Sequence, residues 1–159
     1  MMHSLIIFLG LGLLAISGTL LGSSLGIKAA NTCTPLAVVG DDGTQGTTVK
    51  KTVTPPGASI AFRTNWNTDF AVDNGVSFNR YISTIVPSDG GKYTIKVNLK
   101  YSDDTADKVY DNTVSLAAGK PLHITATPRA NQTPYQVNVY VGELNAVGKT
   151  YVLSASGCR

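Results

Sequence analysis

Histidine is the side chain that most often moves protons near neutral pH, and this sequence holds only His3 and His123. Because His3 lies in an N-terminal leader, a Ser-His-Asp triad would depend on His123 alone. Strand alternation in Leu122-His123-Ile124 places the imidazole opposite its apolar neighbours, which favours a solvated histidine. The chain after the leader also lacks a Gly-x-Ser-x-Gly motif and a phosphate-binding glycine loop. We therefore predict a protein that is not an enzyme and needs no cofactor, and a small hydrolase is the third alternative.

Three aspartates close together, Asp103, Asp104 and Asp107, form the main carboxylate cluster. Calcium takes six to eight oxygen ligands, often from several carboxylates on one loop. The spacing does not match an EF-hand, and a polar turn after a strand would use the same residues. We keep the three aspartates as calcium candidates and otherwise predict no metal site, since one histidine cannot build a His-rich zinc centre.

The two cysteines, Cys33 and Cys158, lie near the two ends of the chain that follows the leader. An even cysteine count in an exported chain favours a disulfide, and two free thiols are the alternative. A bridge here would join the first strand to the last and close nearly the whole domain. In the chain-entropy model such a bridge contributes roughly 4–5 kcal/mol to stability.

The segment 5–27 is uncharged, with an apolar run at 5–16 followed by small residues, and cleavage is acceptable after Gly26 or, as preferred, after Ala29. We predict that residues 1–29 are a signal peptide; the alternative is an uncleaved anchor, which is just long enough to span a bilayer. In both cases the rest of the chain lies outside the cytoplasm, in the periplasm, at the cell surface or secreted. Contact with a membrane is expected only through residues 5–27, if the leader is retained.

From Leu36 onward, apolar and polar residues alternate and turn residues recur at short intervals, as is typical of antiparallel sheets. The clearest strands are 93–101 and 135–141, each with one apolar and one polar face. Further strands are expected at 36–39, 49–54, 59–64, 114–116, 122–126 and 151–156. We predict an all-β, antiparallel two-sheet sandwich, immunoglobulin-like or jelly-roll, which forms a single domain over residues 30–159. A closed barrel is the second choice.

The segment 66–86 is predicted to be a hairpin with its turn at 73–75. A three-residue loop places Trp66 opposite Ile82 and gathers the apolar side chains on one buried face. Trp66 is therefore expected in the core.

The same register places four polar or aromatic side chains together on the opposite face of the hairpin. Asn67 would lie beside Tyr81, and Asp69 beside Asn79. Aromatic faces stack on the apolar faces of sugars, while Asn and Asp hydrogen-bond to hydroxyls. We predict this strip as the ligand surface.

The net charge is +3 with 14% charged residues, and the basic residues are scattered, so nucleic acid is not an expected partner. The sequence favours a non-enzymatic binding module at the cell envelope or outside the cell that recognises a protein or a glycan. The alternative is a structural envelope or surface-assembly subunit that pairs through an exposed edge strand. The oligomeric state is not predicted.

Overall fold

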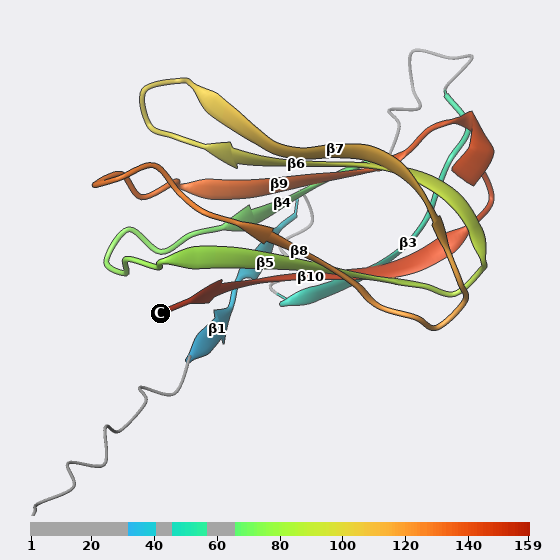
Figure 1. Cartoon of the computed structure of the whole chain (residues 1–159), viewed down its shortest axis with the longest axis horizontal. Helices are drawn as coiled ribbons and strands as arrows, with labels where there is room; N and C mark the ends of the chain where they lie inside the picture. Colours follow the sequence, from blue (N-terminus) through green and yellow to red (C-terminus); the bar gives the residue numbers. More distant parts are fainter. Residues whose placement is uncertain (1–31, 41–45, 57–65) are drawn as a thin grey trace, which may run out of the picture.

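The computed structural model describes residues 32–40, 46–56 and 66–159, and these form two facing antiparallel sheets (Figure 1). The strands are β1 (Cys33–Pro35), β2 (Ala37–Val39), β3 (Thr48–Thr52), β4 (Asn67–Ala71), β5 (Arg80–Pro87), β6 (Gly91–Lys100), β7 (Ala106–Leu116), β8 (Leu122–Ala126), β9 (Gln136–Gly142) and β10 (Thr150–Cys158). A 3-10 turn, η1 (Leu144–Ala146), precedes β10. The predicted all-β sandwich is confirmed. The leader and the strand expected at 59–64 lie outside the described residues.

The strand order identifies the type of sandwich. One sheet runs β1-β10-β5-β8, and β3 also pairs with β10. The other sheet, which we call the β9 sheet, runs β2-β4-β9-β6-β7. From β3 onward the chain passes back and forth between the two layers, and each sheet interleaves early and late strands. This order is that of a jelly roll, one of the two sandwich types predicted.

Alternating apolar side chains fill the space between the two sheets, as period-two patterning requires. In β6, Tyr93, Ile95, Val97 and Leu99 are fully buried, and the alternate residues face outward. Strand β9 pairs with β6 in register and also buries every second residue, starting at Val137. The two strands with the clearest alternation therefore form the centre of the β9 sheet. Among the described residues, no helix is long and apolar enough to cross a membrane.

The predicted hairpin at 66–86 is wrong, because β4 and β5 belong to different sheets. Strand β4 pairs with β2 and β9, whereas β5 pairs with β8 and β10. The turn at 73–75 does form, with the Val76 N–H donating to the Asp73 carbonyl at 3.1 Å. The chain crosses there from one layer to the other. The hairpin register turned Ile82 inward and Tyr81 outward, whereas β5 buries Tyr81 and leaves Ile82 partly exposed.

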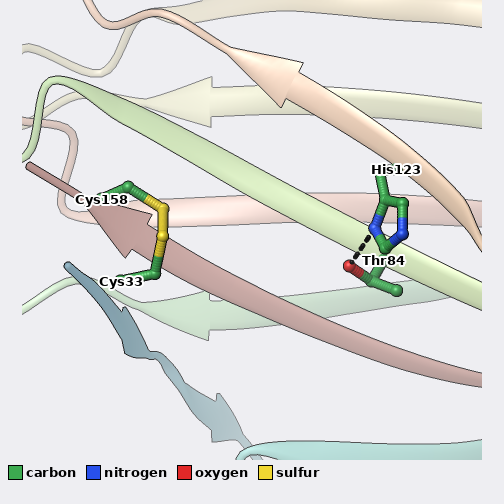
Figure 2. The surroundings of a disulfide bond; sticks show 4 residues. All are labelled: Cys33, Thr84, His123 and Cys158. Atoms are coloured by element: carbon green, nitrogen blue, oxygen red, sulfur yellow. Dashed lines mark hydrogen bonds between the residues drawn. A yellow bond between two sulfur atoms is a disulfide. The ribbon is translucent and has the colours of Figure 1, made fainter. Parts of the chain in front are cut away.

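The predicted disulfide is confirmed (Figure 2). Cys33 and Cys158 are directly opposite each other in the antiparallel pairing of β1 with β10, and their sulfur atoms are bonded. Strand β1 is only three residues long and exposed. The bridge therefore fixes a short edge strand that few other contacts hold.

Gly157 in β10 leaves the space that the Phe78 ring occupies. A Cβ at this position would lie 2.4 Å from Phe78 Cδ2, which is closer than atoms can approach. We expect Gly157→Ala to lower the free energy of unfolding by about 1–3 kcal/mol, because the ring must move out of its packed position. Urea denaturation measures this effect. Gly75→Ala is the matched control, since its Cβ would come no closer than 3.6 Å to any other atom. Equal stability of the two variants would contradict the prediction.

Candidate functional site

The outward face of the β9 sheet carries a connected set of polar side chains. Strand alternation directs Asn67 and Asp69 of β4, Asn138 of β9, and Asn98 of β6 to this side. The register aligns Asp69, Asn138 and Asn98 across three neighbouring strands. We call these four residues the Asn-Asp ladder.

Asn138 is the centre of the ladder. Its Nδ2 group donates to Asp69 Oδ1 at 2.8 Å and to Asn67 Oδ1 at 3.3 Å. Its Oδ1 atom accepts a hydrogen bond from Asn98 Nδ2 at 3.1 Å. Only 6% of Asn138 is exposed, because its neighbours cover it on a face that is otherwise exposed to solvent. These bonds hold the surrounding side chains in one arrangement.

An aromatic pair lies next to the ladder. Tyr140 is two residues after Asn138 and is opposite Asn67 of β4 in the register. Its ring packs against the Trp66 ring at nearly a right angle, with the ring centroids 5.7 Å apart. Lys96 Nζ lies 5.2 Å from the centre of the same ring. Burial, reinforced by the Glu143 carboxylate, raises the pKa of Tyr140 to about 12, so the phenol stays neutral and can donate a hydrogen bond.

Trp66 is partly buried against the core, at the end of β4, and its Nε1 donates to the Thr54 carbonyl at 2.8 Å. Its ring packs on Gly142, where a Cβ would lie 2.6 Å from the indole. One side of the Trp66 ring therefore packs toward the core, where the tryptophan was expected. The ring also contacts Tyr140.

Two lysines surround the single carboxylate of the ladder. Lys100 Nζ contacts Asp69 Oδ1 at 3.2 Å, and both side chains are about one-third exposed. Lys51 Nζ donates to the Asn67 carbonyl oxygen at 2.7 Å. Burial lowers the pKa of Lys51, and the nearby Asp69 carboxylate opposes this effect. A partly exposed pair of this kind contributes little to stability.

The structure separates the four predicted ligand residues. Asn67 and Asp69 lie in the ladder. Tyr81 is only 1% exposed and belongs to the core, in the other sheet, where burial raises its pKa to about 12. Asn79 lies at one end of the sandwich, beside a pocket lined by the loop at 128–133. Tyr81 and Asn79 therefore do not extend the surface that contains Asn67 and Asp69.

Sequence reasoning missed the other half of this surface, Asn98, Asn138 and Tyr140. The signal was present, since alternation in 93–101 and 135–141 directs all three away from the core. What the sequence did not supply was the pairing of β4 with β9 rather than with β5.

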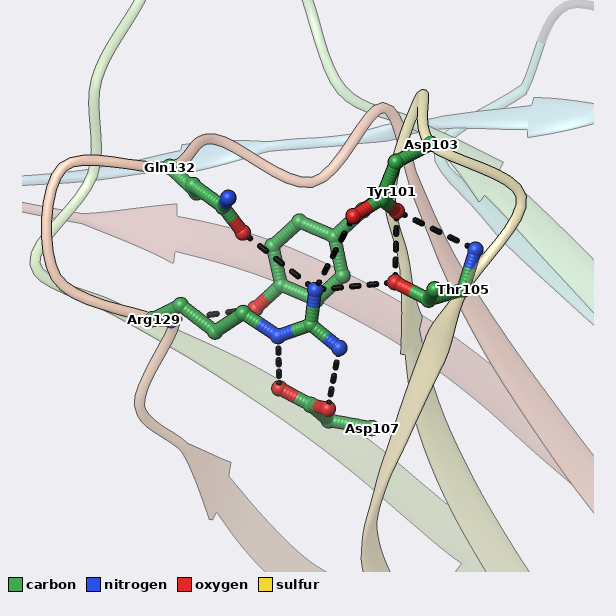
Figure 3. Close-up of polar contacts among 6 residues, drawn as sticks. All are labelled: Tyr101, Asp103, Thr105, Asp107, Arg129 and Gln132. Atoms are coloured by element: carbon green, nitrogen blue, oxygen red, sulfur yellow. Dashed lines mark hydrogen bonds and ion pairs between the residues drawn. The ribbon is translucent and has the colours of Figure 1, made fainter.

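The aspartates proposed for calcium have another partner (Figure 3). Both carboxylate oxygens of Asp107 accept hydrogen bonds from Arg129, at 2.8 and 2.7 Å. Asp103 contacts Arg129 at 3.5 Å and also accepts from Thr105. The guanidinium carbon lies 4.2 Å from the centre of the Tyr101 ring. A calcium ion would have to displace this arginine.

Asp104 takes no part in the Arg129 contacts and instead adopts the left-handed conformation of a turn, with φ of 61°. Within the described residues, no group of three or more His, Cys, Asp or Glu side chains could hold a metal ion.

The Arg129 cluster predicts a pH dependence. Hydrogen bonds and the arginine charge lower the pKa values of Asp103 and Asp107 in the folded state. The resulting stabilisation is complete above their unfolded pKa of about 4 and is lost as the pH falls through the lower folded values. Arg129→Gln should therefore flatten the acidic side of a plot of Tm against pH. Arg80→Gln is the control. An unchanged acidic slope in Arg129→Gln would contradict the assignment.

His123 is exposed on β8, as predicted, and its Nδ1 atom lies 3.0 Å from Thr84 Oγ1 of the paired strand β5 (Figure 2). No carboxylate of the described residues is hydrogen-bonded to the ring. The imidazole therefore lacks the acidic partner that orients a triad histidine.

Comparison with known proteins finds only distant likenesses to solved structures. No family model matches the sequence, and no curated protein matches it. Among solved structures, a mutant of the family 29 carbohydrate-binding module CBM29-2 has a TM-score of 0.44 at 10% identity, over 81% of this chain and 74% of that one. The Clostridium thermocellum xylanase 10B CBM22-1–GH10 modules, complexed with xylohexaose, have a TM-score of 0.36 at 11% identity, over 78% and 25%. At this identity the likeness does not extend to function.

Proposed function

We propose that this protein is an exported, non-catalytic module that binds a carbohydrate chain on the outward face of the β9 sheet. The observation that carries the proposal is the Asn-Asp ladder with Tyr140 beside it. The leader predicted at 1–29 and the Cys33–Cys158 disulfide support export, because structural disulfides persist mainly in oxidising compartments.

The ladder leaves donors and acceptors for a ligand after satisfying its own bonds. Among the described residues, Asn67 Nδ2, Asp69 Oδ2 and Asn98 Oδ1 have no partner. A sugar hydroxyl is both a donor and an acceptor, so vicinal hydroxyls can bridge such a mixed set. The ladder crosses two strand spacings, about 10 Å, which allows contact with more than one sugar ring.

Preorganisation favours this face over an ordinary polar surface. The ladder side chains lie on strands and are fixed by mutual hydrogen bonds, so binding would cost little conformational entropy. Tyr140 adds a half-buried ring on which the apolar face of a sugar can stack in place of the Lys96 ammonium. The one histidine of the described residues, His123, lies on β8 in the other sheet.

A glycan array followed by titration calorimetry with the best oligosaccharide tests the proposal. Tyr140→Ala should weaken binding about fivefold, because stacking contributes about 1 kcal/mol. Tyr135→Ala is the matched control, since Tyr135 is 45% exposed and precedes β9 outside the ladder. Trp66, the only tryptophan in the sequence, contacts Tyr140, so its fluorescence should change on binding. Equal affinities of the two variants, or binding of no glycan, would refute the proposal.

The alternative, a surface-assembly subunit, would use the free edge of β7. This strand is eleven residues long and lies at the end of the β9 sheet. Its pairing with β6 is interrupted by an irregularity between Val97 and Asn98, and Lys108 and Asp111 form an ion pair on it. Bulges and charges are features that protect edge strands from pairing. A concentration-dependent oligomer in size-exclusion chromatography would favour this alternative.

A further inference from the structure

The pocket beside Asn79 lies at one end of the sandwich, and no residue of the ladder lines it. It has a volume of about 530 Å³, which is in the range of small-molecule sites. One wall is the loop at 128–133, and the other is the segment 77–79 before β5. Pro128, Ala130 and the mostly buried Phe78 supply apolar surface.

The loop wall is held rigidly by Arg129 (Figure 3). Besides its two bonds to Asp107, Arg129 Nη1 donates to Thr105 Oγ1 at 2.8 Å and to Gln132 Oε1 at 3.3 Å. The backbone N–H of Arg129 donates to the Tyr101 hydroxyl at 3.0 Å. The cluster therefore ties the loop to the connection between β6 and β7. A pocket with a fixed wall loses little entropy when a ligand binds.

The chemistry of the pocket is polar but uncharged. Its one cation, Arg129, is neutralised by Asp107 and Asp103. The remaining polar groups are the amides of Asn79, Asn131 and Gln132, together with the hydroxyls of Ser77 and Thr133. Within the described chain, the side chains of Asn79 and Asn131 have no protein partner.

Two details describe the loop amides. Asn131 adopts a left-handed backbone conformation with φ of 61°, which asparagine tolerates better than most residues. Gln132 accepts the bond from Arg129 through Oε1, so its Nε2 group remains a donor. Amides and hydroxyls supply donors and acceptors in pairs, and these match neighbouring hydroxyls on a sugar ring rather than an ionic group.

We propose that this pocket is a separate binding site for a single neutral sugar unit, such as the end of a glycan chain. The site shares no residue with the Asn-Asp ladder, so it can be tested independently of the function proposed above. The ligand class follows from three observations: the volume of the pocket, its neutralised arginine and its three amides.

Two-dimensional NMR with methyl glycosides of glucose, galactose, mannose and xylose tests the site, and methyl glucuronide and acetate serve as charged comparators. At least one neutral glycoside should shift the side-chain amide signals of Asn79, Asn131 and Gln132. Asn79→Ala and Gln132→Ala should each weaken this binding about three- to tenfold, as expected for one lost hydrogen bond. Asn74→Ala is the matched control, because this exposed loop residue does not line the pocket.

The outcomes separate the two sites. Chemical shift changes at the pocket amides that persist in the Tyr140→Ala variant would support the pocket site, even if the ladder binds no glycan. Shifts confined to Asn98 and Asn138 would overturn the pocket and leave the ladder in place. The absence of a shift with every glycoside, or a response to the charged comparators alone, would overturn the pocket as well. Both substituted side chains are exposed or lie on the pocket wall, and a circular dichroism melt confirms that the variants fold.

Discussion

Reduction of the Cys33–Cys158 disulfide should lower the free energy of unfolding by about 2–5 kcal/mol. The bond closes a loop with a sequence separation of 125 residues, which is nearly the whole described domain. Strand β1 is short and exposed, so the bridge preserves few native contacts. Most of its effect is therefore expected through the unfolded chain, which becomes more expanded once the crosslink is removed.

Urea denaturation with and without a reductant measures this effect on the unmodified sequence. The slope of stability against urea should rise on reduction, because the uncrosslinked unfolded chain exposes more surface. A Cys33→Ala, Cys158→Ala double variant is the control and should not respond to the reductant. A loss of less than about 1 kcal/mol in the reduced protein would show that the bridge is not a major source of stability.

Asn138→Ala should weaken binding of the selected oligosaccharide about a hundredfold. The substitution leaves Asn67 Oδ1 without a donor, Asn98 Nδ2 without an acceptor, and Asp69 Oδ1 with Lys100 as its remaining donor. Loss of the two hydrogen bonds to the ligand that the released Asn67 and Asn98 side chains would make, at about 1.4 kcal/mol each, corresponds to this factor. Because Asn138 is nearly buried, stability should also fall, by about 1–3 kcal/mol.

A second substitution at this position separates packing from hydrogen bonding. Asn138→Asp keeps the size of the side chain but replaces the donor with a charge beside Asp69, so it should also lose binding. Asn112→Ala, an exposed asparagine on β7, is the matched control and should bind normally. Calorimetry on folded samples decides the question, and unchanged affinity in Asn138→Ala would remove the ladder from the binding site.

At the ladder, alternation predicted which face each side chain occupies but not which strands are neighbours. Alternation in 93–101 and 135–141 correctly placed Lys96, Asn98, Asn138 and Tyr140 on the side away from the core. Alternation in 66–71 likewise placed Asn67 and Asp69 on a polar face. The prediction failed where it paired this strand with its successor in the chain, which also turned Tyr81 outward although it is buried. In a jelly roll, consecutive strands often belong to opposite layers, so sequence proximity is a poor guide to pairing.

The aspartate cluster shows the same limit. The spacing of Asp103 and Asp107 was compatible with a cation, and the structure supplies one as a guanidinium from Arg129, more than twenty residues away. No local pattern connects the two segments. They meet because β7 begins at the end of the sandwich where the loop before β9 also lies.

The amino-acid sequence by itself was enough to predict that this protein is a sandwich of two β-sheets and that a disulfide joins its two ends. Period-two alternation is a property of each strand alone, and the two cysteines needed only to lie near the two ends of one small domain. Only the tertiary structure decided which strands are neighbours, and with them which polar side chains share a surface. The physical reason is that burying an apolar face stabilises many pairings almost equally. The choice among them depends on contacts between residues far apart in the chain.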